Sequence, residues 1–167
     1  MPEGRTAGPD FGEYAAQRSA RLLRTAYLLC RDWATAEDLV QTALTRAWLA
    51  WRRIGDDPDP YVYRILVNTH ASWWRRRWRG EVPTGRLPDR PDPASAAVED
   101  REVLWDALAR LGRRERAAVV LRYFADLEHA AIAEILGCSP VTVRSQISRA
   151  LAKLRVDPSL SPAREEI

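Results

Sequence analysis

The chain has 167 residues, of which 46% are hydrophobic, and a formal net charge of +3 at pH 7. This length allows one mid-sized domain or two small ones, and the apolar content is sufficient for hydrophobic cores. The N-terminus lacks a signal-peptide pattern and no apolar run approaches about 18 residues, so we expect a cytoplasmic protein without membrane insertion.

Cys30 and Cys138 are the only cysteines and are predicted to be buried thiols. Together with His70 and His129 they do not have the spacing of a zinc site.

The first half of the chain predicts helices and no strand, because its apolar residues recur at helical rather than alternating spacing. Residues 1–9 are expected to form a disordered lead-in. Asp10 is expected to cap a first helix that runs to about Cys30, since Glu13 stands three positions later in the capping-box pattern.

The segment DWATAEDLVQTALTRAWLAW predicts the second helix, with Thr35 as its N-cap. Helical spacing places Leu39, Ala43 and Trp48 towards the core. The polar side chains expected to project away from the core are Asp38, Gln41, Thr42 and Arg46.

A third helix is expected to begin near Pro60 and to run through YVYRILVNTHASWWRRRW. Its end, residues 71–79, holds four Arg and three Trp and no acidic residue. This combination favours a nucleic-acid partner over an ordinary solvated face. Residues 80–97 contain four Pro and two Gly, which predicts a flexible, extended linker.

The second half predicts three further helical segments and then a long last helix. Gly137 is expected to close the short helix EHAAIAEIL, Ser139 to cap the last helix, and Pro140 to occupy its first position, where the missing N–H costs nothing. A short helix, a tight turn with Gly and a longer helix form a helix-turn-helix. The predicted fold is therefore all-α, with two small helical domains joined by the flexible linker.

The last helix divides into two faces at about 100° per residue. Its apolar face consists of Val143, Ile147, Ala150, Leu151 and Leu154. The opposite face carries Val141, Ser145, Ser148, Arg149 and Ala152, flanked by Thr142 and Arg144. Small and basic side chains let a helix enter the major groove while arginines reach base edges or phosphates.

The segment AEILGCSPVTVRSQISRALAKLR resembles domain four of the extracytoplasmic-function (ECF) group of bacterial sigma factors. In that family the first half of the second helix contacts the −35 promoter element. The resemblance implies −35 contacts by Thr142, Arg144, Ser145, Ser148 and Arg149. Lys153 and Arg155 are then expected to contact phosphate or solvent. LuxR-type output domains share this pattern, so the motif by itself leaves both families open.

The segment TAEDLVQTALTRAW resembles the central helix of sigma domain two, which docks on the clamp coiled coil of the RNA polymerase β′ subunit. The resemblance implies polymerase contacts by Asp38 and Gln41. An α/β receiver domain, with apolar strands that end in an acidic phosphate-acceptor site, is expected ahead of a LuxR-type output domain and is not evident in this half of the sequence.

The segment YVYRILVNTHASWWRRRWR resembles the part of sigma domain two that recognises and melts the −10 element. The residues implied in −10 contact and melting are Tyr61, Tyr63, Asn68, Trp73, Trp74, Arg75, Arg76 and Arg77. Many family members have Asp where Ser72 stands, so their −10 base preferences are not carried over.

The sequences RILVNTH, WWRR and EVPT further resemble the SigE-type factors common in actinomycetes. The resemblance covers about residues 11–155. It predicts a lead-in (1–9), sigma domain two (10–79), a linker (80–97), sigma domain four (98–156) and a tail (157–167).

The sequence thus predicts a sigma factor that binds core RNA polymerase, recognises −35 and −10 elements and melts promoter DNA. The partners implied are the β′ clamp coiled coil, the β flap and promoter DNA; no enzymatic activity, cofactor or metal is implied. Two alternatives stay open, a stand-alone helix-turn-helix regulator and a helical adaptor protein. The sequence also leaves open the promoter, the inducing signal and whether an anti-sigma factor binds.

Overall fold

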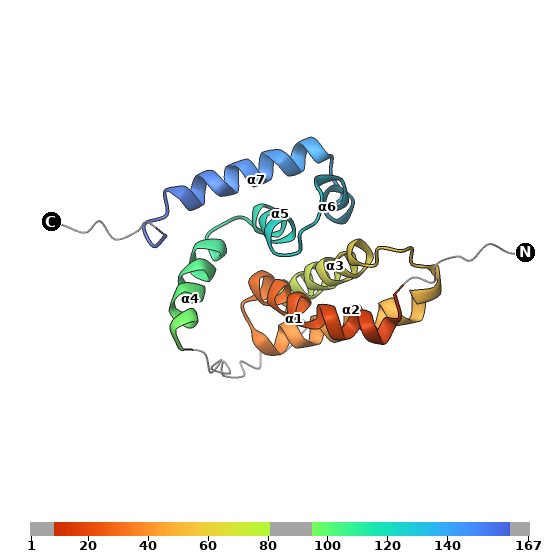
Figure 1. Ribbon diagram of the computed structural model, residues 1–167. Helices are drawn as coiled ribbons and strands as arrows, with labels where there is room; N and C mark the ends of the chain where they lie inside the picture. The colour runs from red at the N-terminus through yellow and green to blue at the C-terminus, as the bar shows by residue number, and fades with distance from the viewer. Residues whose placement is uncertain (1–8, 81–94, 161–167) are drawn as a thin grey trace, which may run out of the picture. The chain divides into compact units, whose positions relative to one another are not determined.

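The computed structural model describes the backbone of residues 9–80 and 95–160, and the side chains of 9–80 and 101–160. Within these ranges the chain is helical and contains no strand, which confirms the predicted all-α class (Figure 1). The chain divides into two compact units, Met1–Leu87 and Pro88–Ile167. No helix in the described part of the chain is both long and apolar enough to span a membrane.

Helix α1 (Phe11–Cys30) begins as the sequence predicts. The Asp10 carboxylate accepts a hydrogen bond from the backbone N–H of Glu13 at 3.3 Å, so Asp10 is the N-cap. The helix ends at Arg31, whose left-handed backbone lets its N–H donate to the carbonyl of Tyr27.

Helix α2 (Trp33–Ala50) begins earlier than predicted, and the assignment of Thr35 as its N-cap is wrong. Asp32 is the cap, because its carboxylate accepts from the Thr35 N–H at 2.9 Å and from the Thr35 hydroxyl at 2.5 Å. The Trp33 ring stacks on that of Tyr27, with ring centroids 4.0 Å apart. The added first turn is therefore fixed to α1 by both a cap and an aromatic contact.

After a 3₁₀ turn, η1 (Trp51–Arg53), the chain enters α3 (Asp59–Trp78). Helix α2 packs against both α1 and α3, and fully buried side chains from all three form the core, among them Leu22, Leu39, Ala43, Val62, Tyr63 and Leu66.

A buried polar contact fixes the start of α3. The Tyr14 hydroxyl donates to the Asp59 carboxylate at 2.7 Å, and Arg18 lies 3.4 Å from the same carboxylate. Burial, and then Asp59 itself, raises the pKa of the Tyr14 hydroxyl, which therefore stays a donor. A buried carboxylate needs such partners, so this contact holds α3 on α1.

The predicted orientation of the second helix holds for Leu39 and Ala43 but is wrong for Trp48. Leu39 and Ala43 are fully buried, whereas Trp48 is 60% exposed. At about 3.6 residues per turn, Trp48 lies about two and a half turns after Leu39 and hence on the opposite side of α2. Small residues, Ala43, Ala47 and Ala50, occupy the packed side instead.

The second unit contains four helices: α4 (Ser95–Ala109), α5 (Arg113–Tyr123), α6 (His129–Leu136) and α7 (Pro140–Arg155). Helix α7 packs on α5 and α6.

The predicted linker is shorter than expected at its end. Because α4 begins at Ser95, residues 95–97 are helical and not part of an extended linker as predicted. Ala96 and Ala97 have high helix propensity, which favours this earlier start. The rest of the predicted linker from residue 81, the lead-in to residue 8 and the tail from residue 161 lie outside the described residues.

The turn between α6 and α7 has the predicted geometry. Gly137 closes α6 with a φ of 66°, a left-handed conformation that favours glycine. Ser139 caps α7 by accepting from the Thr142 N–H at 3.2 Å, and Pro140 stands in the first turn. These local interactions set the direction in which α7 leaves the turn.

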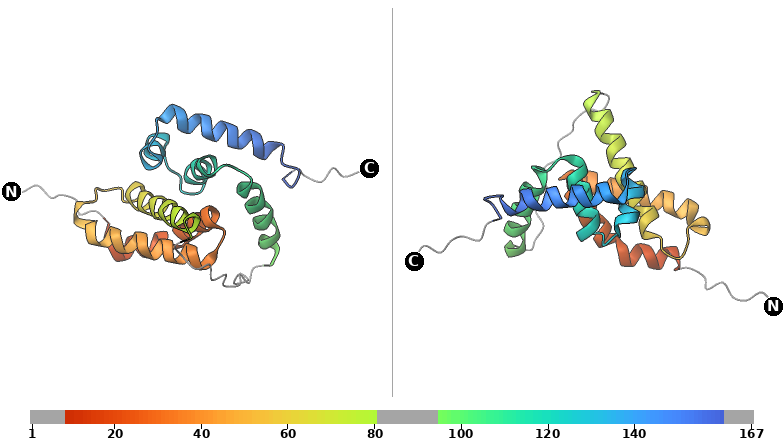
Figure 2. Two further views of the ribbon diagram at one scale, coloured as in Figure 1. Left: turned by 180° about the vertical axis from the view of Figure 1, so that it is seen from behind. Right: turned by 90° about the horizontal axis from the view of Figure 1, so that it is seen from above.

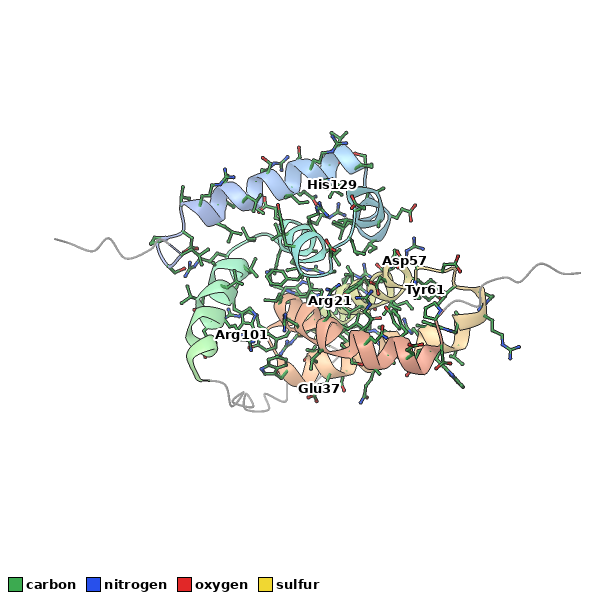
Figure 3. The ribbon with its side chains drawn as sticks, in the orientation of Figure 1. Arg21, Glu37, Asp57, Tyr61, Arg101 and His129 are labelled. Carbon is green, nitrogen blue, oxygen red and sulfur yellow. The ribbon has the colours of Figure 1, made fainter. Side chains whose placement is uncertain are left out.

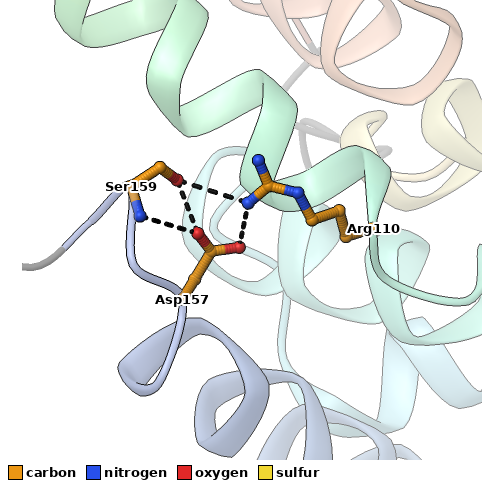
Figure 4. Close-up of polar contacts among 3 residues, drawn as sticks. All are labelled: Arg110, Asp157 and Ser159. Carbon is orange, nitrogen blue, oxygen red and sulfur yellow. Dashed lines mark hydrogen bonds and ion pairs between the residues drawn. The ribbon is translucent and has the colours of Figure 1, made fainter.

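Residues 157–160 belong to the second unit, although the predicted tail begins at 157. Asp157 is buried and accepts hydrogen bonds from the Arg110 guanidinium, from the Ser159 N–H at 3.0 Å and from the Ser159 hydroxyl at 2.6 Å (Figure 4). Arg110 first, and then Ser159, lowers the pKa of Asp157 to about 2. We call this contact the Arg110–Asp157 clasp; it joins the end of α4 to the segment after α7.

Cys30 and Cys138 are free, half-buried thiols rather than fully buried ones. The Cys30 thiol donates to the carbonyl of Asp32 at 3.2 Å, and burial raises its pKa to about 12. Cys30 therefore contributes to the α1–α2 turn as a neutral thiol.

We expect Asp157→Asn to destabilise the second unit at pH 7, because Arg110 loses its anionic partner. The pKa of Asp157 is depressed from 3.8 to about 2 in the fold, so its stabilisation is present above about pH 4 and is lost as pH falls towards 2. The measurements are the unfolding midpoint by circular dichroism and the amide hydrogen exchange of Ser159. The matched control is Glu102→Gln, which removes the charge of an exposed carboxylate in α4. Equal stability of the two variants at pH 7, or a difference from wild type that persists undiminished at pH 3, would contradict the role of the clasp.

Candidate functional site

The side of α2 that faces away from α1 and α3 is exposed and chemically mixed. We define the outer α2 face as Asp38, Gln41, Thr45, Trp48 and Leu49, which are all exposed and lie within about 100° of one another on the helix. Trp48 is 60% and Leu49 71% exposed. Large apolar side chains beside exposed polar ones are typical of a protein-binding surface.

An open pocket of about 420 Å³ lies beside this face. Its lining residues are Asp38, Gln41, Thr42, Thr45 and Arg46 from α2 and Trp73 from α3. The Arg46 guanidinium lies 3.5 Å from the Thr69 hydroxyl and so links the pocket rim to α3. Asp38 and Gln41, both predicted to contact polymerase, thus line the same pocket. Trp73, predicted to contact DNA, lines it as well.

The end of α3 leaves the helical bundle. Burial on α3 extends from Asp59 to Thr69, and all residues from Trp74 to Arg79 are exposed. Figure 2 shows this end of α3, in yellow-green, running out beyond the other helices of its unit. The side chains of Arg75, Arg76 and Arg77 are therefore available to an external polyanion.

The exposed residues of α3 lie on different sides of the helix. Tyr61, Asn68 and Arg75 recur at intervals of two turns and form one line. Figure 3 shows Tyr61 near Asp57, at the start of that line. Trp74 and Trp78 form a tilted pair on another side, with ring centroids 6.0 Å apart. Trp78, 75% exposed, was not among the predicted site residues.

Tyr63 cannot serve as the DNA contact that the sequence predicted. Its exposure is 0%, and burial raises the pKa of its hydroxyl to about 12. Tyr63 lies about half a turn from Tyr61, on the side of α3 that faces the core. It is a core residue, and the prediction for it is wrong.

The outer face of α7 is exposed as the helical pattern predicts. Thr142, Arg144, Ser145, Ser148 and Arg149 are all exposed, while Val143, Ile147 and Ala150 are buried. Gln146, which was assigned to neither face, is buried between the apolar positions. The Thr142 hydroxyl lies 2.9 Å from that of Ser139, so it is held at the cap.

Lys153 has a partner that the sequence analysis did not predict. Its ammonium lies 2.8 Å from the carboxylate of Glu115 in α5. The pKa of the Glu115 carboxyl is lowered, chiefly by the hydrogen bond from Lys153 and less by the nearby charge of Arg149. The basic side of α7 is therefore partly neutralised by α5.

A metal site is not evident: among the residues that the structure describes, no group of three or more His, Cys, Asp or Glu side chains could hold an ion.

An exposed helix-turn-helix face in one unit and a projecting aromatic-basic helix in the other are typical of a helical DNA-binding protein. The family models for Sigma-70 region 2 and Sigma-70 region 4 match residues 15–80 and 101–154. The chain belongs to the ECF group of the sigma-70 family, and its function is that of an RNA polymerase sigma factor. The regulator and adaptor alternatives are not favoured.

Two relatives and one solved structure illustrate this family. The RNA polymerase sigma-E factor of Streptomyces coelicolor is 42% identical over 149 residues, covering 87% of this chain and 84% of that protein. The ECF RNA polymerase sigma factor SigL of Mycobacterium tuberculosis is 33% identical, covering 84% of each. The structure of the sigma factor RpoE in complex with the anti-sigma factor NepR, from Bartonella quintana, aligns with a TM-score of 0.74 at 27% identity, covering 87% of this chain and 94% of that one.

Proposed function

We propose that this sigma factor acts in the cytoplasm as a non-catalytic subunit that docks on core RNA polymerase through α2, engages the −10 element through α3 and reads the −35 element through α7. In this proposal residues 10–79 are sigma domain two, and residues from 98 to the Arg110–Asp157 clasp are sigma domain four. The chain positions DNA, and the bond-forming chemistry belongs to the core enzyme.

The observation that carries the proposal is the outer α2 face. Three exposed polar side chains, Asp38, Gln41 and Thr45, lie on the same side of α2 as the exposed indole of Trp48. Buried apolar anchors surrounded by polar groups are the usual energetic centre of a protein interface. We therefore add Trp48 and Leu49 to Asp38 and Gln41 as polymerase contacts, and we assign Trp73, in the adjoining pocket, to this surface rather than to DNA.

The −10 role rests on the projecting end of α3. Arg75, Arg76 and Arg77 supply charge for the phosphates of the separating strands, and exposed aromatic rings offer stacking surfaces for unpaired bases. Tyr61, Asn68, Trp74 and Trp78 are the exposed candidates for base contact. Each lost stacking step costs about 1.4 kcal/mol and a captured base returns about 1–3 kcal/mol. One or two captured bases cannot support a long bubble, so melting requires the core polymerase.

The −35 role rests on the exposed face of α7. Ser145 and Ser148 are small enough for close approach of the helix to the groove, and Arg144 and Arg149 are long enough to reach base edges. Thr142 stands at the capped first turn, where helix N-termini contact DNA.

An anti-sigma factor is a further proposed partner. The supporting observation is the similarity to RpoE, which was solved in complex with the anti-sigma factor NepR. An inhibitor that covers the outer α2 face would compete directly with polymerase.

Charge reversal by Asp38→Arg is expected to weaken binding to core polymerase roughly tenfold, since a complementary charge becomes a repulsive one. The measurement is the dissociation constant of the full-length chain for core enzyme without DNA. The matched control is Asp56→Arg, which reverses an exposed charge in the loop before α3. Unchanged affinity of the Asp38→Arg protein would remove α2 from the docking surface.

Replacement of Arg75, Arg76 and Arg77 by Ala is expected to reduce promoter opening about tenfold or more, with a smaller loss of closed-complex binding, because the phosphate contacts of the separated strands are lost. Permanganate reactivity of promoter thymines reports the opening. Arg52→Ala with Arg53→Ala, in the exposed η1 turn, is the control for loss of charge. Normal bubbles in the triple variant would exclude this role.

Arg149→Ala is expected to lower run-off transcription through a loss of about 1–3 kcal/mol in −35 discrimination, the range for an arginine that bonds a guanine edge. The assay uses reconstituted holoenzyme on a promoter with an intact or a scrambled −35 element, with Arg155→Ala as the control. If scrambling the element leaves wild-type transcription unaffected, α7 does not read it.

A further inference from the structure

Glu115 faces the basic side of α7 from the neighbouring helix. It stands in the first turn of α5, with its carboxylate 2.8 Å from the Lys153 ammonium. The Glu115 side chain is 13% exposed and that of Lys153 is 57% exposed. The acid is therefore largely enclosed, whereas the ammonium remains open to a ligand.

The start of α5 helps to hold this carboxylate in place. Gly112 is the N-cap of α5, and its backbone N–H also lowers the pKa of Glu115 through a hydrogen bond. An acidic side chain near a helix N-terminus is stabilised by the helix dipole. The position of Glu115 is thus supported from within α5 as well as by Lys153.

Glu115 acts on two basic residues of α7. Arg149 and Lys153 are four residues apart and hence neighbours on one helical face. The charges of both lower the pKa of the Glu115 carboxyl. At neutral pH the local sum is one negative and two positive charges, so a net single positive charge faces solvent where two would otherwise stand.

Resting on the proposed −35 role of α7, we infer that Glu115 is a specificity-determining residue that limits sequence-independent attraction of α7 to DNA phosphates. Phosphate contacts supply essentially all of the binding to a wrong site but only part of the binding to the right one. On a wrong site no base contact fixes the position of α7, so a lysine released from Glu115 can strengthen that complex more than the right one. Specificity is the ratio of affinities for the right and the wrong site, and it is raised by weakening the wrong complex. By pairing with Lys153 and reducing the field of Arg149, Glu115 leaves discrimination to the base-reading residues of α7.

The test compares wild type with Glu115→Gln, which removes the charge and keeps the shape. Holoenzyme binding is measured by fluorescence anisotropy on promoter DNA with an intact or a scrambled −35 element, over a series of salt concentrations. We expect Glu115→Gln to bind the scrambled DNA roughly threefold more tightly, the scale of a surface ion pair. The slope of log K against log salt should steepen by up to about 0.9, the value for one further neutralised phosphate. The ratio of intact to scrambled affinity should fall.

Three further variants show whether the effect arises through Lys153. In a Lys153→Gln background, Glu115→Gln should have a smaller effect, because the released ammonium is absent. Glu115→Asp keeps the charge and should keep the wild-type salt slope. Glu102→Gln, at an exposed position in α4, removes an equal charge elsewhere and should change neither slope nor ratio.

The outcomes separate this inference from the proposed function. If wild type does not distinguish the intact from the scrambled element, the −35 role fails. If wild type does distinguish them and Glu115→Gln leaves the salt slope and the ratio unchanged, or weakens binding to both DNAs, the inference about Glu115 is overturned. An effect of equal size in the Lys153→Gln background would overturn it as well.

Discussion

The arrangement of the first unit depends on the close packing of α2 along only one side. Ala36, Ala43, Ala47 and Ala50 are buried there. Because these side chains are small, α1 and α3 can pack against the same side of α2, and the core is completed without its other side. The outer α2 face is thus free to carry an exposed indole beside polar groups. Exposure of large apolar side chains to water is unfavourable in free energy. A protein partner that covers them on binding removes this cost.

The second unit uses one helix for two purposes by a similar division. Val143, Ile147 and Ala150 anchor α7 in the core, and the small and basic residues between them remain exposed. The turn geometry at Gly137 and Ser139 fixes the direction of α7, so its outer face is presented without rearrangement. The acid of α5 then adjusts the charge of that face from outside the motif. The shape and the charge of this exposed face are therefore set by different helices.

Some features that depend on a few adjacent residues are predictable from the sequence, but the N-cap of α2 and the contacts between residues far apart in the chain are not. The caps at Asp10 and Ser139 and the turn at Gly137 follow from local hydrogen bonding. The prediction that Trp48 faces the core is wrong because its distance along the helix puts it opposite Leu39. Tyr63 and Tyr61 are the same type of residue and differ only in the side of α3 on which they lie. The Lys153–Glu115 pair joins positions 38 residues apart, and no sequence spacing indicates it.

The Arg110–Asp157 clasp bears on how the second unit should be isolated for biophysical work. The region 4 family model ends at residue 154, before the acid that completes the clasp. A fragment cut at that boundary would lose Arg155, the last residue of α7, and would leave the Arg110 guanidinium without its carboxylate. A fragment that extends through Ser159 would retain all three groups of the contact. A limit drawn by sequence similarity can therefore fall inside a structural unit that hydrogen bonding defines.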